Sequence, residues 1–158
     1  MLPPDVFKLY VRLALLYNRA NGDNNMNILL MAHSGLRWII LLIAVVAIIK
    51  FALGWRTGSA FKGMDRGLMA GFSGLMDLQA TLGIIFLLWS GIGAGAGFSR
   101  QRLEHGFVMI LAAVVAHLSV RWKNADDKTR FRNNLFTIIA ALILVLIGIA
   151  SLPGGLSR

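Results

Sequence analysis

The chain has 158 residues, of which 57% are hydrophobic and only 15% are charged, and this composition excludes a soluble domain with a polar surface. Sixteen Lys and Arg against seven Asp and Glu give a net charge of +9, but most basic residues flank apolar runs, so the excess predicts membrane topology and no nucleic-acid partner. The absence of Cys excludes disulfides, thiolate-bound zinc, iron–sulfur clusters and covalently attached haem c.

Residues 1–25 form a first predicted element, which precedes the membrane spans. At about 100° per residue, its charged side chains fall within one narrow arc of a helix and apolar side chains cover the remainder. The residues in the arc are Asp5, Lys8, Arg12 and Arg19. The polar run 21–25 predicts a turn, so we expect an amphipathic helix that lies in the membrane interface or docks on a partner. A cleaved signal peptide, or a native start at Met26 or Met31, is the alternative.

Four apolar segments follow, each long enough to cross about 30 Å of hydrocarbon at about 1.5 Å per residue. They are roughly residues 28–51, 68–92, 103–120 and 135–152. Residues 26–158 are therefore predicted to form an all-α integral membrane bundle of four transmembrane helices, surrounded by lipid.

The charged residues between the spans predict the orientation of the chain. The connections after the first and third spans are basic, whereas the second connection holds only Arg100 and Arg102. The basic residues of those two regions are Lys50, Arg56, Lys62, Arg66, Arg121, Lys123, Lys128, Arg130 and Arg132. By the positive-inside rule these two connections are cytoplasmic, and both termini then lie outside.

Ionisable residues inside a span are costly, so each is a functional candidate, with structural pairing as the alternative. The candidates are His33, Arg37, Asp77, His105 and His117. Two of them are predicted to lie at one level, because His33 precedes Lys50 by 17 residues and His105 precedes Arg121 by 16, which is about 25 Å from the cytoplasmic end in each case.

Two neutral imidazoles at equal depth on two helices are the axial ligands that a haem b needs in a helical bundle. His33 and His105 are therefore the candidate iron ligands. The alternative is that each histidine caps its helix or contacts lipid head groups near the outer surface.

A polar stripe on the second span gives a second candidate region. Ser73, Asp77 and Thr81 recur every four residues and share one helical face, which we expect to look inward. Arg37 lies at a depth that predicts a buried ion pair with Asp77. Alternatively, Asp77 lies near His117, where a buried carboxylate carries protons or holds a quinone. Depths counted from the two ends of the spans disagree on whether Asp77 and His117 meet.

Several short stretches of the chain form a common pattern: Ala32-His33-Ser34-Gly35-Leu36-Arg37-Trp38, Gly54-Trp55, Asp65-Arg66, Asp77-Leu78-Gln79 with Gly83, Glu104-His105 and Ala116-His117. Taken together, these stretches resemble a family of small four-helix bacterial membrane proteins that are generally labelled cytochrome b-like. The resemblance covers about residues 28–153. It implies a haem b in the bundle, with His33 and His105 at the positions of the outer-side histidines. A second haem would need a His partner for His117 on the second helix, where this chain has Asp77, so we expect one haem.

Two classes of function remain. The first is a haem-b electron carrier in a bacterial inner membrane, which exchanges electrons with a quinone pool or a partner complex, with the charge of Arg37 raising the haem potential. The second is a non-catalytic subunit of a larger respiratory or photosynthetic complex, which contacts lipids or pigments. A transporter is less expected for four spans, and no nucleophile–base pair, H-E-x-x-H spacing or nucleotide motif predicts an enzyme.

Overall fold

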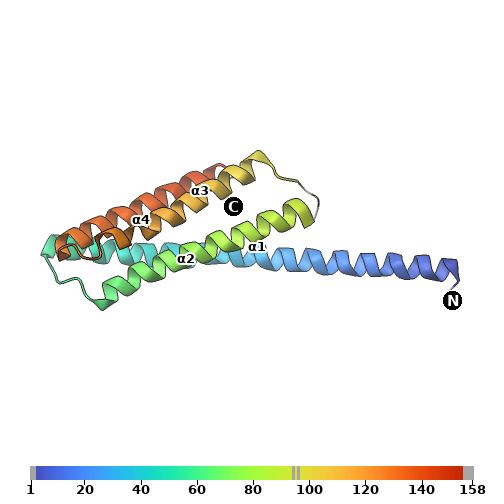
Figure 1. Ribbon diagram of the computed structural model, residues 1–158, viewed down its shortest axis with the longest axis horizontal. Coiled ribbons are helices and arrows are strands. Elements are labelled where there is room, and N and C mark those ends of the chain that lie inside the picture. Colours follow the sequence, from blue (N-terminus) through green and yellow to red (C-terminus); the bar gives the residue numbers. More distant parts are fainter. Residues whose placement is uncertain (1–2, 94, 96, 155–158) are drawn as a thin grey trace.

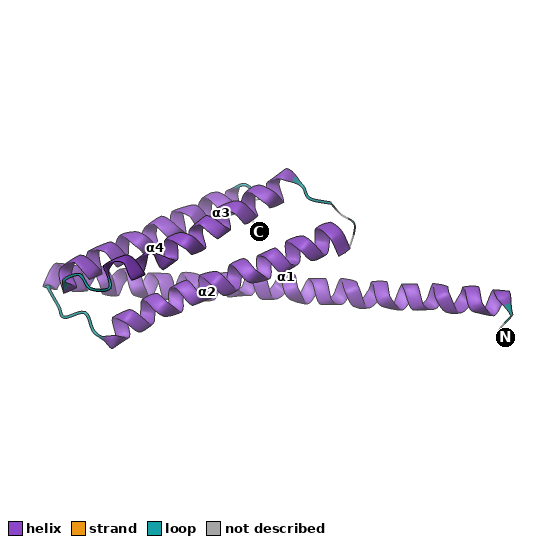
Figure 2. Cartoon of the chain, in the orientation of Figure 1, coloured by secondary structure: helices purple, strands orange, loops and turns teal. Residues whose placement is uncertain are grey.

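The architecture is known from a computed structural model that describes residues 3–93, 95 and 97–154. Four long helices, α1 (Pro4–Thr57), α2 (Gly63–Leu88), α3 (Arg100–Ala116) and α4 (Asp127–Ala150), run alternately up and down (Figure 1). A π-helical turn, Trp89–Gly93, continues α2, and a 3₁₀ segment, His117–Trp122, continues α3. The described residues contain no strand (Figure 2), which confirms the all-helical prediction.

Among the described residues, four helices are long and apolar enough to cross a membrane; three contain a predicted span, and the fourth ends two residues before the predicted end at 152. Their bounds are Asn21–Thr57, Gly63–Gly93, Arg100–Trp122 and Asp127–Ala150. Only 17% to 39% of the most apolar stretch of each helix is buried inside the chain itself. The rest of this apolar surface faces outward, as in a bundle whose solvent is lipid.

The predicted turn at residues 21–25 is wrong, because α1 runs without a break through this polar run. No proline interrupts the run, and Asn, Asp and Gly each weaken a helix by no more than about 1 kcal/mol relative to Ala. The N-terminal part of α1 therefore continues the axis of the first span and projects beyond the bundle (Figure 1). Residues 1–2 and the side chain of Arg19, which belong to the predicted amphipathic element, lie outside the described residues.

Each helix packs against the next in chain order, and α4 closes the ring against α1. As a consequence, α1 and α3 lie diagonally across the core. We call the end that holds the connections 58–62 and 123–126 the basic end, and the opposite end, near His33 and His105, the histidine end. The N-terminal end of α1 and the C-terminal end of α4 both lie toward the histidine end (Figure 1).

The core is most tightly filled toward the basic end. Phe51, Phe61 and Phe131 form an aromatic cluster with ring centroids 4.9 to 6.0 Å apart. Gly54 makes room for this cluster, since a Cβ atom there would lie 2.5 Å from Cε1 of Phe131. The carboxylate of the buried Asp65 has two partners, because Oδ1 forms an ion pair with Lys50 Nζ at 2.9 Å and Oδ2 accepts the Lys62 backbone N–H at 2.7 Å.

Candidate functional site

The two candidate haem ligands face each other across the core at the histidine end. His33 of α1 and His105 of α3 have ring centroids 6.5 Å apart, with their planes at 75°. This confirms that the two rings lie at one level. Two imidazoles that bind one metal ion from opposite sides, with metal–nitrogen bonds of about 2 Å, have centroids about 6 Å apart. The spacing of the two rings is therefore the one that a shared metal ion needs.

A backbone carbonyl fixes the orientation of His105. Its Nδ1 lies 2.7 Å from the carbonyl oxygen of Gly148 in α4. Because a carbonyl oxygen only accepts, Nδ1 carries the hydrogen and Nε2 keeps its lone pair. Metal-binding histidines commonly donate the N–H of their second ring nitrogen to a carbonyl in this way. Gly148 also lacks a side chain that would collide with Met109, so α3 and α4 approach closely at this point.

His33 is held by an amide on α2. The side-chain nitrogen of Gln79 donates to the backbone oxygen of His33 at 2.9 Å and lies 3.2 Å from its Nε2. Since an amide NH₂ only donates, Nε2 of His33 bears a lone pair. His33 Nδ1 and Gln79 Oε1 are buried without a hydrogen-bond partner among the described residues. Gly83 lets the ring pack against α2, because a Cβ atom there would lie 3.0 Å from its Cε1.

Two cavities of about 300 and 250 Å³ flank the histidine pair. The two cavities adjoin one another, because they share half of their lining residues: Leu30, His33, Gln79, Ala80, His105, Met109 and Leu152. The larger volume lies at the lower limit of the range for small-molecule sites and the smaller just below it, and a mostly apolar lining with a few polar groups is typical of such sites.

An arginine lines each cavity. Arg37, one turn from His33, lies in the first, with its guanidinium carbon 5.3 Å from the ring centroid of Trp38. The predicted ion pair between Arg37 and Asp77 is wrong, since the carboxylate contacts His117 instead. Arg102 lines the second cavity and donates to Ser90 Oγ at 3.3 Å. Arg102 was not among the residues singled out from the sequence, although its position three residues before His105 places both on one helical face.

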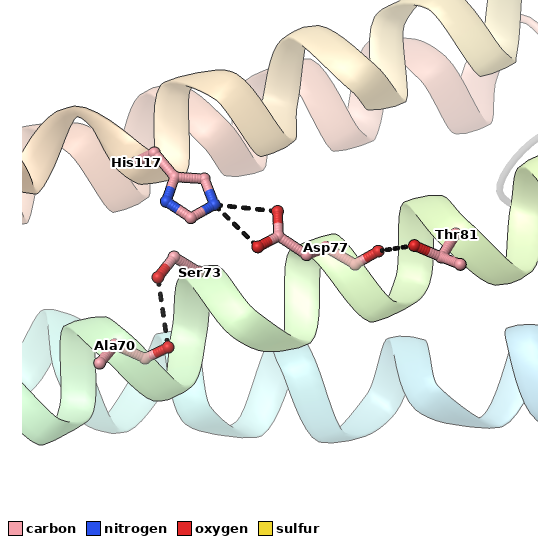
Figure 3. A network of polar contacts seen from close by, with 5 residues as sticks. All are labelled: Ala70, Ser73, Asp77, Thr81 and His117. Atoms are coloured by element: carbon pink, nitrogen blue, oxygen red, sulfur yellow. Dashed lines mark hydrogen bonds and ion pairs between the residues drawn. The ribbon is translucent and has the colours of Figure 1, made fainter.

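The third histidine takes no part in the histidine pair. His117 Nε2 lies 2.9 and 2.8 Å from the two carboxylate oxygens of Asp77 (Figure 3), so the depth counted from the histidine end was the correct one. The depth counted from the basic end was wrong for two reasons. It assumed the rise per residue of an α-helix, whereas His117–Trp122 is a 3₁₀ segment, which rises more per residue. It also assumed that Arg66 and Arg121 lie at one level.

The predicted inward direction of the polar stripe on α2 is also wrong for two of its three members. Ser73 is buried, but Asp77 and Thr81 are exposed on the outside of the bundle between α2 and α3. Residues four apart differ by about 40° in direction around a helix, so a stripe that begins in the core turns outward along α2.

Neither the profile of a known protein family, nor a curated protein, nor a solved structure matches this chain. Within the described residues, no group of three or more His, Asp or Glu side chains could hold a bare metal ion. A haem iron needs no more than two protein ligands, because the macrocycle supplies the other four. Nε2 of each ring bears a lone pair and two cavities adjoin the pair, so these residues fit a haem.

Proposed function

We propose that this chain is a haem-b electron-transfer protein of a bacterial inner membrane, and that His33 and His105 ligate the iron from diagonal helices. The observation that carries the proposal is the facing pair of imidazole rings with centroids 6.5 Å apart. When bound, the haem supplies a one-electron redox couple. Electrons are exchanged with a quinone pool or with a partner redox complex.

The protein contributes fixed geometry and a dry environment. The Gly148 carbonyl holds His105 in the tautomer whose Nε2 would ligate a metal, and the Gln79 amide contacts the Nε2 of His33 that would serve as the second ligand. Apolar side chains such as Leu30, Met109 and Leu152 line the surrounding space and keep water away. A low local dielectric strengthens every charge interaction with the redox centre.

Arg37 tunes the site electrostatically. Its side chain lines the same cavity as both histidines, and no acidic side chain among the described residues pairs with it. A positive charge close to the iron disfavours the oxidised, more positive state, so it raises the reduction potential.

The test is a reduced-minus-oxidised absorbance spectrum of the purified full-length protein, with pyridine extraction to count haem per chain. We expect about one haem b per wild-type chain, in line with one pair of axial ligands. His33→Ala and His105→Ala should each lose the six-coordinate spectrum. The matched control is His117→Ala, which removes a histidine of the same bundle and should keep the haem. A colourless, folded wild-type protein, or a haem that survives both ligand substitutions, contradicts the proposal.

A second function, an accessory subunit of a respiratory or photosynthetic complex, is favoured by one observation. The N-terminal part of α1 projects beyond the bundle and exposes large side chains such as Leu9, Tyr10, Leu13 and Tyr17. A single helix with exposed apolar residues suits contact with another membrane subunit or with pigments. Under this alternative the isolated protein is colourless, and it is recovered from native membranes within a larger assembly that is lost when residues 1–25 are deleted.

A further inference from the structure

The Asp77–His117 pair occupies an unusual position for two ionisable groups. Both carboxylate oxygens lie within 2.9 Å of His117 Nε2, yet the two side chains are 51% and 50% exposed. Asp77 lies near the middle of the candidate span Gly63–Gly93, and His117 lies five residues before the end of the candidate span Arg100–Trp122. The two side chains meet on the outward surface between α2 and α3 (Figure 3). Ionisable groups at this depth usually face the bundle interior, so an outward-facing pair marks a functional surface.

Only a lipid-soluble molecule can reach this pair once the four helices span a bilayer. Exposed apolar side chains flank it along both helices, namely Leu78 on α2 and Val114 and Leu118 on the α3 side. One turn before Asp77, Gly74 has nothing within 4 Å of the place where a Cβ atom would lie. The surface beside the carboxylate is therefore open and flat enough for a planar ring to approach from the hydrocarbon.

The hydrogen bonds around the pair leave one ring nitrogen for a ligand. The hydroxyls of Ser73 and Thr81 donate to the backbone oxygens of Ala70 and Asp77, so neither reaches the carboxylate (Figure 3). His117 Nε2 hydrogen-bonds to the Asp77 carboxylate. His117 Nδ1 points away from that carboxylate and has no hydrogen-bond partner among the described residues. In neutral His117 this Nδ1 accepts a hydrogen bond, and in the imidazolium form it donates one.

We infer that the Asp77–His117 pair binds the head group of a membrane quinone. A hydroquinone presents O–H groups, which donate, and a quinone presents carbonyl oxygens, which accept. The single free nitrogen of His117 can accept from a hydroquinone O–H as neutral imidazole and donate to a quinone carbonyl as imidazolium, while Nε2 contacts the Asp77 carboxylate. The quinone would be the redox partner in the electron transfer proposed above, so the role of this site rests on the proposed function. Binding of the head group itself does not depend on haem.

The experiment measures binding of a benzoquinone and a naphthoquinone, each with a ten-carbon tail, to the full chain in lipid nanodiscs. An azido derivative of each maps the contact by photo-crosslinking and mass spectrometry. We expect saturable binding and crosslinks within residues 70–81 and 111–120. Asp77→Asn and His117→Gln should each weaken binding about tenfold, the effect of losing one charge-assisted hydrogen bond. Thr81→Val is the matched control on the same face and should bind within about twofold of wild type.

The outcomes separate this inference from the haem proposal. Haem content and helical circular dichroism of Asp77→Asn and His117→Gln should match those of wild type, which shows that the fold and the histidine end are intact. A colourless protein that still binds the quinone at this face overturns only the haem proposal. If the protein contains haem, any of three results would overturn the quinone inference. The wild-type protein binds no quinone, both variants bind it as wild type does, or the crosslinks join this face to a second copy of the chain instead.

Discussion

The basic end and the histidine end of the bundle treat buried polar groups in opposite ways. At the basic end, the carboxylate of Asp65 is only 2% exposed and has both a cation and a backbone N–H within 2.9 Å. At the histidine end, His33 Nδ1 and Gln79 Oε1 are buried without a partner among the described residues, beside cavities of about 300 and 250 Å³. The same four helices are therefore packed for stability at one end and left open at the other.

The open packing has a physical cost that a ligand can offset. Cavities forgo dispersion contacts, and each unpartnered buried polar atom costs roughly 1 to 3 kcal/mol. A ligand that fills the space and binds the imidazoles recovers part of this energy, and it stabilises the folded chain by mass action. The comparison therefore predicts that substitutions at the basic end change stability, whereas substitutions at the histidine end change ligand binding.

The largest expected effect comes from Asp65→Ala at the basic end. The substitution leaves the Lys50 ammonium, which is 32% exposed, and the Lys62 N–H without their partner. Removal of one member of a buried ion pair should lower the free energy of unfolding by about 3 kcal/mol. The measurement is a titration of detergent-solubilised protein with sodium dodecyl sulfate, followed by circular dichroism.

Asp127→Ala is the matched control, because Asp127 also lies in the first turn of a helix at the basic end. Its carboxylate is 47% exposed and lies 3.9 Å from the Arg130 guanidinium, so the loss should stay below about 1 kcal/mol. Equal losses for the two variants would show that the buried pair contributes nothing specific to the packing of this end.

Gly54→Ala tests the tight packing itself and should have the next largest effect. The new Cβ atom would lie 2.5 Å from the Phe131 ring, so the aromatic cluster must shift, at a cost of about 2 kcal/mol. Gly67→Ala on α2 is the control, because nothing lies within 4 Å of its added Cβ atom. That variant should be neutral or more stable by up to about 1 kcal/mol, since Ala favours a helix over Gly. The same titration compares the two, and the reverse order contradicts the packing argument.

The sequence predicted the parts of this structure that depend on length and hydropathy. The four spans follow from apolar runs, and the common level of His33 and His105 follows from helical rise alone. It did not predict the continuity of α1 through residues 21–25, because Asn and Gly weaken a helix without forbidding it.

Side-chain partners were harder to predict than helix positions. Asp77 pairs with His117 and not with Arg37 because of how each helix is rotated about its axis and because a 3₁₀ segment follows α3. Small errors in the assumed helical phase are enough to hide this preference. The contact that orients His105 comes from the backbone of Gly148, and no side-chain pattern in α4 signals a carbonyl. Arg102 was overlooked for a different reason, since a basic residue next to a loop was counted only as a topological charge.

Arg102→Gln is the corresponding test at the histidine end and should leave stability nearly unchanged. Arg102 lines the cavity beside both histidines, and its described polar contact is Ser90 at 3.3 Å, so its guanidinium is free to pair with an acidic group of a bound haem. Loss of that charge-assisted hydrogen bond should weaken haem binding about tenfold, while the unfolding free energy of the haem-free chain changes by less than about 0.5 kcal/mol.

Arg100→Gln is the matched control, because Arg100 is exposed and pairs with Glu104 one turn later, and it should bind haem as wild type does. Haem titration of the two variants decides the matter: equal affinities would mean that the charge at the mouth of the cavity does not recognise the ligand.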